Sequence, residues 1–538
     1  MSLLNLIDEK KAKKLYIIVA ALVTCAAILV FIKGVFPYAT TARTTAWFAV
    51  ILAMLLAMIG FFTFMVIREK KFTYSMLFVV VTIGWTLIYQ MIIPPVSGTD
   101  EHMHYGCAYY VSDMILGTTD TTGLPGDEDV EDGLVMRYED ALKWVDVDCK
   151  YPDSYKVLSG SDFFATKDNQ QLMVANMTYY KMWIRYIPSG IGIALGRLLG
   201  LGFTPTIYLG RLMNTIMFLL LGLLALKLLP VGRMQMVSIA MIPLFIQETA
   251  SLSYDAISNT LCIFIAAYCL HLSQEETKIR IWDVLVLMIS FILLIPNKGV
   301  YIAFAIMLFM VPIKRWLAFA ERVCGSRKRM IIIIAVFVVL VVLLGIKLSG
   351  NFIGYFRAMF RDTGAVIEQD PTRLAWTLGY AVKHPYATAM LWWQTFGQFG
   401  FYYVRLMLGE KLANLNLEIE VPENYIVILF AIMMIQMRTS WLHGKMIDRR
   451  RRIIWNITLV ATMLLICFGC MVRFTPIDTD VLQLSGRYIL PIFASALLVY
   501  GTDEEENPRT LRLLAWQNLA IVPIAINVLQ NLAQRPWQ

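Results

Sequence analysis

The sequence predicts an all-α polytopic membrane protein. Of its 538 residues, 58% are hydrophobic and only 16% are charged, and the mean hydropathy is +0.63. Soluble domains are roughly one quarter charged, so the composition excludes an ordinary soluble enzyme. Apolar runs of the roughly 20 residues that a helix needs to cross a bilayer recur along almost the whole chain.

We expect about thirteen membrane spans, each assigned to one apolar run. They lie near residues 15–36, 45–67, 73–93, 206–229, 234–250, 254–273, 281–296, 299–313, 330–348, 424–438, 452–471, 487–501 and 511–530. Two further stretches, 187–202 and 388–407, are too short, too rich in glycine or too aromatic for a crossing. We expect these two stretches to lie at the membrane surface.

Basic residues between the predicted spans set the orientation. They form four clusters: Lys10, Lys11, Lys13 and Lys14; Arg68, Lys70 and Lys71; Lys314 to Arg329; and Arg449 to Arg452. Alternating spans place all four clusters on one side, which the positive-inside rule makes cytoplasmic. The amino terminus is then inside and the carboxyl terminus outside, and we expect an integral protein of a bacterial plasma membrane. Because the net charge of +8 comes largely from these clusters, it does not indicate nucleic-acid binding.

The same alternation divides the chain into five regions. They are a three-helix region (1–93), a first extracytoplasmic loop (94–186), a central bundle (187–348), a second extracytoplasmic loop region (349–423) and a carboxyl-terminal bundle (424–538). The first loop is acidic, with sixteen Asp and Glu against seven Lys and Arg. It also contains Cys107 and Cys149, which could form a disulfide in an oxidising compartment, although sharing a loop does not establish the pairing.

The sharpest local pattern follows the third predicted span. Pro94 and Pro95 end the helix, and Asp100, Glu101, His102 and His104 follow at the extracytoplasmic interface. Two adjacent carboxylates can divide the work of a proton acceptor and of a group that orients a hydroxyl or holds a cation, and imidazoles add proton transfer or metal binding. The alternative is a solvated helix start with Asp100 as its cap.

Further polar residues reach the same side of the membrane from distant spans. They are Arg211, Ser253 with Asp255, Lys298, and Arg487 with Tyr488. Ionisable groups near membrane depth are costly and are candidates for function. Two or three cations there can bind a lipid phosphate, for which the planar fork of arginine is well suited. The alternative is that Arg487 and Lys298 only extend their charged ends to the interface.

These motifs resemble a known family, the DUF2142-type predicted membrane proteins, which the resemblance places in the GT-C class of glycosyltransferases. The matching residues, spread over about residues 75–500, are Asp100, Glu101, His104 and Tyr105; Tyr186, Pro188, Gly196, Arg197, Gly210, Arg211, Leu212 and Asn214; Ser253 and Asp255; and Gly486, Arg487, Tyr488 and Pro491. Thr99 stands where the family usually has proline, and more spans precede Pro94 than the single one typical of GT-C enzymes.

The resemblance implies a GT-C-like transmembrane helical bundle and an inverting transfer of a sugar from a polyprenyl-phosphate donor. The acceptor would be a surface polysaccharide, a cell-wall polymer or a glycolipid. The expected residues are Asp100, Glu101 and His104 for catalysis, also as ligands of a Mg or Mn ion; Arg487, Lys298 and Arg211 for the donor phosphate; and Asp255, His102 and Tyr488 for acceptor or metal. The alternative is a transporter or flippase of a lipid-linked sugar, which a continuous polar track across the bilayer would favour.

Overall fold

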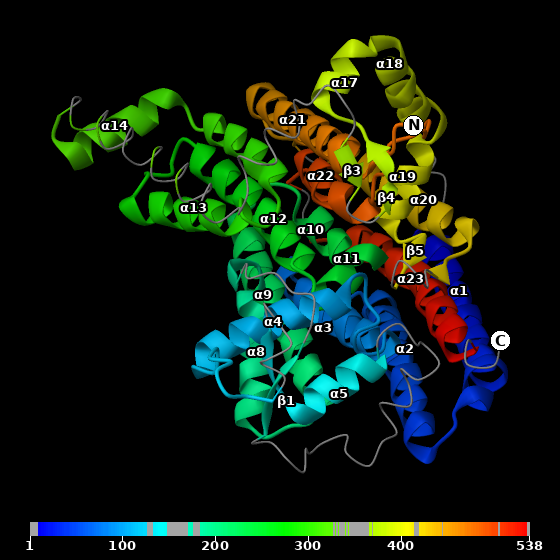
Figure 1. Ribbon diagram of the computed structural model, residues 1–538. Coiled ribbons are helices and arrows are strands. Elements are labelled where there is room, and N and C mark those ends of the chain that lie inside the picture. The colour runs from blue at the N-terminus through cyan, green and yellow to red at the C-terminus, as the bar shows by residue number, and fades with distance from the viewer. Residues whose placement is uncertain are drawn as a thin grey trace.

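The computed structural model describes residues 9–125, 133–147, 171–175, 183–326, 329, 332, 339, 343, 365–367, 370–413, 419–443, 445–503 and 506–534. Within these residues the chain is a bundle of helices, with short two-stranded sheets (Figure 1). This architecture is consistent with the predicted all-α membrane protein. Cys149 lies outside the described residues, so the pairing of Cys107 with Cys149 stays a prediction.

Seven helices in the described part of the chain are long and apolar enough to cross a membrane. They are α1 (Glu9–Val30) with its π and 3-10 continuation to Tyr38, α2 (Ala42–Arg68), α3 (Tyr74–Ile92), α9 (Phe203–Leu228), α12 (Asp255–Ser273), α21 (Arg449–Phe474) and α23 (Pro508–Gln534). Their outward faces are apolar: Leu22 of α1 is 64% exposed and Phe64 of α2 is 52% exposed. Such faces are stable against lipid, and the backbone N–H and C=O groups of each helix hydrogen-bond to one another within that helix.

The predicted count of thirteen spans is not confirmed. The run 330–348 lies largely outside the described residues, and five other runs form helices that are not among the seven. They are α10 (Arg233–Ile239) with α11 (Pro243–Thr249), α13 (Ile281–Leu294), the 3-10 helix η6 (Gly299–Met310), α20 (Glu423–His443) and α22 (Gly486–Val499). η6 is bent by 87° from α14 (Ile313–Cys324).

An apolar run indicates that a segment is shielded from water, and the shield can be either lipid or protein. In α10 and α11, every residue from Met234 to Ala250 is buried within the described structure. This segment is therefore apolar because other helices enclose it, and its two short helices need not cross the bilayer. Composition alone cannot separate the two cases.

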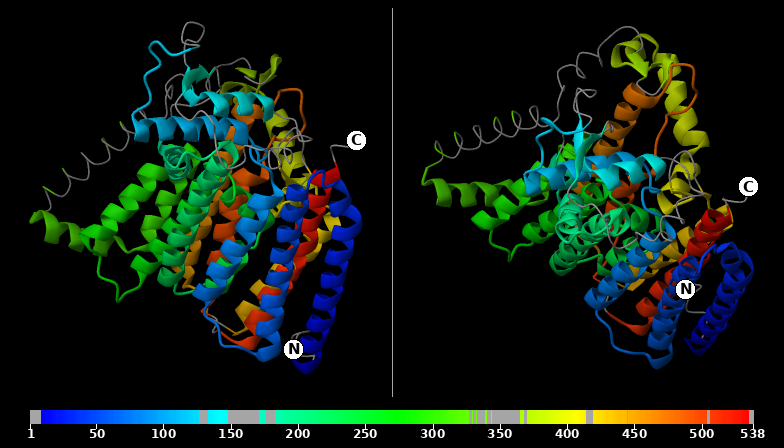
Figure 2. Two further views of the ribbon diagram at one scale, coloured as in Figure 1. Left: turned by 90° about the horizontal axis from the view of Figure 1, so that it is seen from below. Right: turned by 60° about the horizontal axis from the view of Figure 1, so that its bottom comes forward.

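The predicted basic clusters gather at one end of the bundle. Lys13 Nζ lies 2.6 Å from Glu69 Oε1 at the start of α1 and the end of α2. Arg315 and Arg451 both donate to Gln274, which follows α12, over 2.9 Å and 3.5 Å. In Figure 2 (left) the start of α1 lies at the lower end of the bundle. The positive-inside rule makes this end the cytoplasmic one, which remains a prediction.

The opposite end carries the described strands. All three sheets are antiparallel pairs: β1 (Leu134–Arg137) with β2 (Leu172–Ala175), β3 (Ala365–Ile367) with β4 (Asp370–Ala375), and β5 (Lys411–Leu412) with β6 (Ile419–Glu420). The helices of the same two chain regions are α4 (Glu101–Leu116), α5 (Tyr138–Val147), α17 (Leu378–Lys383), α18 (Pro385–Trp393) and α19 (Gly400–Leu408). Figure 2 shows α4 and α5 above the bundle, opposite the start of α1.

Two glycines let helices approach closely beneath this end. A Cβ on Gly192 of α8 (Ile187–Leu198) would lie 2.3 Å from the carbonyl oxygen of Leu209 in α9. A Cβ on Gly486 at the start of α22 would lie 2.6 Å from the carbonyl carbon of Leu406 in α19. Both contacts are with backbone, which cannot yield as a side chain can. These positions therefore require glycine, which lets α8 pack closely on α9 and α22 on α19.

Candidate functional site

The loop between α3 and α4 holds a strained backbone. Pro94 and Pro95 cannot continue α3, which ends at Ile92. Val96 and Asp100 then adopt left-handed conformations, with φ of 64° and 53°. A left-handed β-branched residue is rare and costs energy, which surrounding contacts must offset. Asp100 stands at the N-cap position of α4, but its side chain makes no capping hydrogen bond. The alternative interpretation, in which the Asp100 side chain caps the helix, is therefore wrong.

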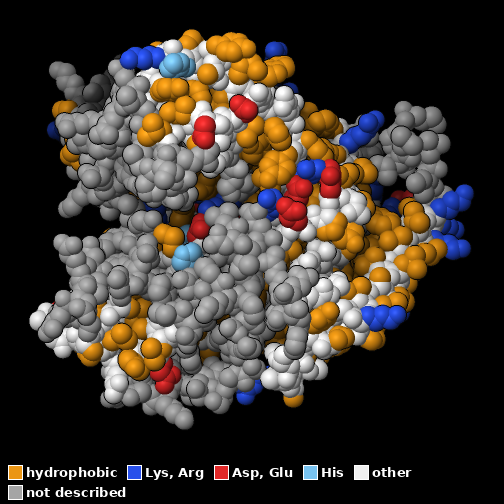
Figure 3. Space-filling model, turned by 45° about the vertical axis from the view of Figure 1, so that its right-hand side comes forward, with side chains coloured by type: hydrophobic (Ala, Val, Ile, Leu, Met, Phe, Trp, Pro, Cys, Tyr) orange, Lys and Arg blue, Asp and Glu red, His pale blue; other side chains and the backbone are white. Residues whose placement is uncertain are grey.

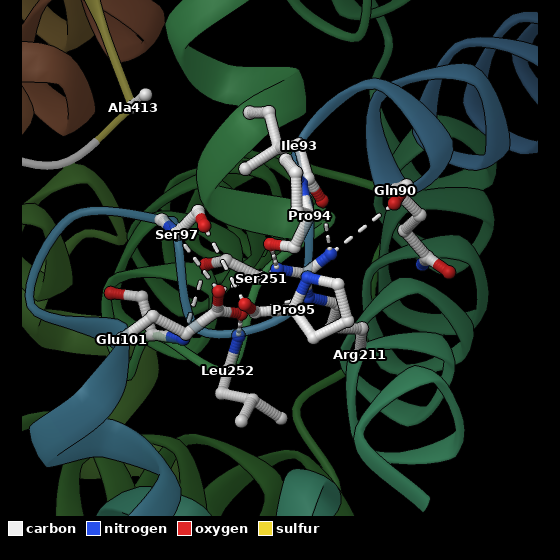
Figure 4. Close-up of polar contacts among 12 residues, drawn as sticks. Gln90, Ile93, Pro94, Pro95, Ser97, Glu101, Arg211, Ser251, Leu252 and Ala413 are labelled. Carbon is white, nitrogen blue, oxygen red and sulfur yellow. Dashed lines mark hydrogen bonds and ion pairs between the residues drawn. The ribbon is translucent and has the colours of Figure 1, made fainter. Parts of the chain in front are cut away.

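Glu101 and Arg211, which we call the structural pair, hold this loop (Figure 4). Arg211 Nε and Nη2 donate to the two carboxylate oxygens of Glu101 over 2.8 Å and 2.5 Å. The remaining Arg211 donors reach the carbonyls of Gln90, Ile93 and Pro94 over 3.2, 2.7 and 2.7 Å. All five guanidinium N–H donors are thus used.

The Glu101 carboxylate is equally saturated. The backbone N–H groups of Gly98 and Leu252 each donate to it over 3.0 Å, in addition to Arg211. Glu101 is fully buried. Burial alone would raise its pKa, but the charge and hydrogen bonds of Arg211 and the two amides outweigh burial and leave the pKa below its ordinary value. Both partners of the structural pair are therefore charged and fully occupied.

Four other ionisable residues, which we call the site cluster, meet beside this loop: Asp100, Asp255, Lys298 and Arg487. Arg487 Nη2 donates to Asp100 Oδ2 over 2.6 Å. Lys298 Nζ donates to Asp255 Oδ1, and Arg487 Nε lies 3.9 Å from Asp255 Oδ2. Residues far apart in the chain are thus brought into one network at the end of the bundle opposite the basic clusters.

The site cluster is less saturated than the structural pair. In the described part of the chain, Arg487 Nε and Asp255 Oδ2 are buried without a hydrogen-bond partner, and the Asp100 side chain is 27% exposed. Burial alone would raise the pKa of Asp100, but the charge and hydrogen bond of Arg487 hold it below its ordinary value. In the space-filling view of Figure 3, acidic, basic and histidine side chains come together at a recess of the surface. Donors and acceptors are therefore free to meet a ligand.

Aromatic rings and one imidazole border the site cluster. His104 Nδ1 and Tyr186 Oη share a hydrogen bond of 3.0 Å, and both rings contact Tyr254 edge-on. Lys298 Nζ lies 4.0 Å from the centre of the Tyr488 ring and 5.3 Å from that of Tyr254. Burial lowers the pKa of His104 to about 4, so this imidazole is neutral at neutral pH.

His102 reaches the same region. It follows Asp100 by two residues, and its ring is partly buried. The predicted acceptor or metal residues Asp255, His102 and Tyr488 therefore border Asp100 and Arg487, whereas Arg211 does not reach the site cluster with any free donor.

The predicted metal ligands do not form a ready donor set. Among the described residues, no three His, Cys, Asp or Glu side chains are grouped to hold an ion. Glu101 accepts four hydrogen bonds, which leaves it no lone pair for a metal. Asp100 and Asp255 are each paired with a cation. The predicted Mg or Mn ion stays untested, and no step below depends on it.

Glu248 is a buried carboxylate that the sequence analysis assigned to an apolar span. It lies near the end of α11, is 1% exposed, and is acted on electrostatically by Asp255, Arg487 and Lys298. One signal was present: Glu248 is an acidic residue within an otherwise apolar run, which in a membrane protein indicates function or a buried partner.

Thr99 joins the loop before α4 to α11 and to the segment after β5. Its hydroxyl donates to the carbonyl of Ala413 over 2.8 Å and accepts from Gln247 Nε2 over 3.3 Å. Gln247 Oε1 in turn accepts from the N–H of Ala413 over 2.8 Å. This side-chain bridge fixes the residue before Asp100, which proline would fix through its ring.

Other residues of the shared motifs hold helices together. Arg197 of α8 donates to Asp113 of α4 over 2.7 Å, and its guanidinium lies 4.3 Å from the centre of the Tyr109 ring. Asn214 of α9 donates to the carbonyl of Ser251 over 2.8 Å and so fixes the turn before Asp255. These motif residues position the site and do not belong to it.

A family model described as "Predicted membrane protein (DUF2142)" matches residues 81–496. The matched range begins within α3 and ends within α22, so it includes both the structural pair and the site cluster. No curated protein and no solved structure matches the chain.

Proposed function

We propose that this chain, which belongs to the DUF2142 family of predicted membrane proteins, transfers a sugar from a polyprenyl-phosphate donor to a glycan, cell-wall polymer or glycolipid acceptor outside the cytoplasm. The observation that carries the proposal is the contact of Asp100 with Arg487. A carboxylate and a phosphate-binding cation meet at the end of the bundle opposite the basic clusters, where a lipid phosphate can approach.

The proposed reaction is a direct displacement that inverts the anomeric carbon. Asp100 accepts the proton of the acceptor hydroxyl, whose oxygen bonds to the anomeric carbon as the bond from that carbon to the phosphate oxygen breaks. The bonding pair leaves with polyprenyl phosphate, which gains one negative charge. Arg487 and Lys298 stabilise that charge, and such stabilisation is commonly the largest catalytic contribution.

The neighbouring groups have separate parts in this proposal. His104 is neutral near pH 7 and orients the acceptor hydroxyl. Asp255 keeps the Lys298 ammonium in place through their ion pair, and Tyr488, whose ring lies against that ammonium, borders the acceptor. Glu101 and Arg211, predicted as catalytic and phosphate-binding residues, become positioning residues, because their hydrogen-bonding groups are already used.

The rival function, transport of a lipid-linked sugar, draws support from one feature, the interrupted pair α10 and α11. Broken helices often line transporter sites. However, α12 carries no Asp, Glu, Lys or Arg between Asp255 and its end, and α9 carries none between Arg211 and Lys227. The ionisable residues gather at one end of these helices instead of following them across the bilayer, which favours an enzyme.

The proposal is tested by assaying transfer in membranes with a radiolabelled polyprenyl-phosphate sugar. We expect Asp100→Asn and Arg487→Ala each to lower the rate by about a hundredfold or more, since general-base and electrostatic contributions have this size. Lys411→Ala, at the ion pair of the partly buried Lys411 with the exposed Glu420, is the matched control. Near-normal transfer by both site variants would remove the assignment.

Two further measurements complete the test. Mass spectrometry of surface glycans with and without the gene would identify the sugar and its attachment point. Incubation with a chelator, followed by added Mg²⁺ or Mn²⁺, would test the predicted metal: a rate lost with the chelator and restored by the ion would support it.

A further inference from the structure

Three buried polar side chains next to the site cluster lack hydrogen-bond partners among the described residues. They are Glu248, Asn259 and Asn297, which are 1%, 0% and 3% exposed. Both carboxylate oxygens of Glu248 and both amide atoms of each asparagine are without a partner. About nine in ten buried polar groups in proteins have one, and leaving them without one is costly. Several such groups in one place therefore indicate a polar ligand.

Asn259 and Asn297 come from the two segments that the ion pair of Asp255 with Lys298 joins. Asn259 follows Asp255 by four residues on α12, so the two side chains share a face of the helix. Lys298, which follows α13, donates to Asp255 at the start of α12. This face of α12 is therefore turned toward the segment between α13 and η6, in which Asn297 directly precedes Lys298.

Glu248 approaches the same place from α11. Asp255, Arg487, Lys298 and the Ser253 hydroxyl all act on its carboxyl group, although neither of its oxygens makes a hydrogen bond of ordinary geometry to the described residues. The three side chains thus come from three separate segments, which are α11, α12 and the turn between α13 and η6.

The kinds of atom identify the ligand's chemistry. Glu248, Asn259 and Asn297 together offer four oxygen acceptors and two NH2 groups, with four N–H donors, without partners in the described part of the chain. An ionised phosphate only accepts hydrogen bonds, so it cannot satisfy carboxylate and amide oxygens. Hydroxyl groups donate and accept, and can meet both kinds of atom.

We propose that Glu248, Asn259 and Asn297 form a subsite that binds the hydroxyl groups of a sugar ring. This subsite rests on the proposed function, which it extends from phosphate and proton chemistry to sugar recognition. The ring belongs either to the donor lipid or to the acceptor glycan. A site that hydrogen-bonds hydroxyls discriminates strongly between sugars, because the wrong one leaves buried groups unpaired.

The test measures binding to the purified full-length protein in lipid nanodiscs. The probes are undecaprenyl phosphate alone and the same lipid carrying glucose, galactose, mannose or arabinose. We expect Asn259→Ala and Asn297→Ala to weaken binding of the best sugar-bearing lipid roughly tenfold each, as one lost hydrogen bond would, and to change binding of the bare lipid less than about twofold. Glu248→Gln, which keeps the side-chain volume, should also weaken the sugar-bearing lipid selectively.

A second arm distinguishes the source of the sugar ring. Methyl glycosides of the same four sugars are bound to protein saturated with undecaprenyl phosphate. If the asparagine variants bind only the glycosides more weakly, the subsite holds the acceptor sugar. If they bind only the sugar-bearing lipid more weakly, it holds the donor sugar. Either result supports the subsite.

Asn518→Ala is the matched control. Asn518 is equally buried but accepts from Trp85 Nε1 over 3.1 Å, away from the site cluster, and should lower the unfolding temperature without changing sugar preference. The subsite is overturned if the asparagine variants weaken bare and sugar-bearing lipids equally, or change binding of no probe. Because binding needs no turnover, this result is independent of whether Asp100→Asn abolishes transfer.

Discussion

Asp100 and Glu101 are neighbours in the chain, and each faces a buried arginine. The two ion pairs differ in how many of their hydrogen-bonding groups are without a partner. In the structural pair, Glu101 and Arg211 have no hydrogen-bonding position left. In the site cluster, the Asp100 carboxylate is partly exposed, and Arg487 Nε makes no hydrogen bond to the described residues. A saturated pair can only hold the loop, whereas an unsaturated one can exchange partners with a substrate.

The largest effect should come from breaking the structural pair. Glu101→Gln leaves the Arg211 charge buried without a counter-ion, which costs about 3 to 5 kcal/mol. We expect the free energy of unfolding in detergent, followed by thermal or denaturant unfolding, to fall by that amount. The matched variant Asp100→Asn should lose less, because the Asp255 carboxylate still lies 3.9 Å from Arg487 and balances its charge. Equal losses in the two variants would contradict the distinction between the pairs.

Replacing the arginine of the site cluster tests the other half of the comparison. Arg487→Lys keeps the charge but removes the planar fork that can meet two phosphate oxygens. We expect the transfer rate to fall about 100-fold, with the unfolding temperature nearly unchanged. A wild-type rate in Arg487→Lys would show that a point charge suffices, and that the geometry of the guanidinium is not used.

Lowering the pH should decrease the free energy of unfolding through His104. Its pKa is about 4 in the folded chain because it is buried, against about 6.5 in an unfolded chain. Between these values the unfolded state binds a proton that the folded state does not, so stability falls as pH decreases from 6.5 to 4, by roughly 1 to 3 kcal/mol.

The check is the pH dependence of the unfolding temperature for wild type and His104→Gln. The variant should lose most of the decrease between pH 6.5 and 4, while the decrease below pH 4, where Asp100 and Glu101 become protonated, should persist. A variant curve parallel to that of wild type over the whole range would assign the effect to other groups.

The sequence predicted the class of the fold and the residues that meet, but not their division of labour. Alternating spans and the basic clusters brought Asp100, Asp255, Lys298 and Arg487 to one side, because the bilayer restricts a helix to two exits. The same reasoning could not tell that Arg211 would be enclosed by the carbonyls of the loop at Pro94. Hydrogen-bond saturation depends on side-chain placement within a few tenths of an ångström, which span boundaries do not fix.

Glu248 and the short helices were missed for a related reason. The run 234–250 is as apolar as a membrane span, but the structure encloses it in protein as α10 and α11. A hydropathy average treats Glu248 as a tolerated exception within a span. Only the packing of α11 beside α12 and α22 makes it a third carboxylate at the site cluster.

The smallest effect should come from Thr99, which belongs to neither pair but holds the backbone directly before Asp100. Thr99→Val keeps the shape and removes the hydroxyl that bridges Ala413 and Gln247. Because each neutral hydrogen bond contributes about 0.5 to 1.5 kcal/mol, we expect a loss of about 1 kcal/mol in unfolding free energy. Thr99→Pro should recover part of that loss by restricting the chain before the left-handed Asp100. If Thr99→Pro instead lowers the unfolding free energy as much as Glu101→Gln does, the hydrogen bonds of Thr99 stabilise the loop as strongly as the structural pair.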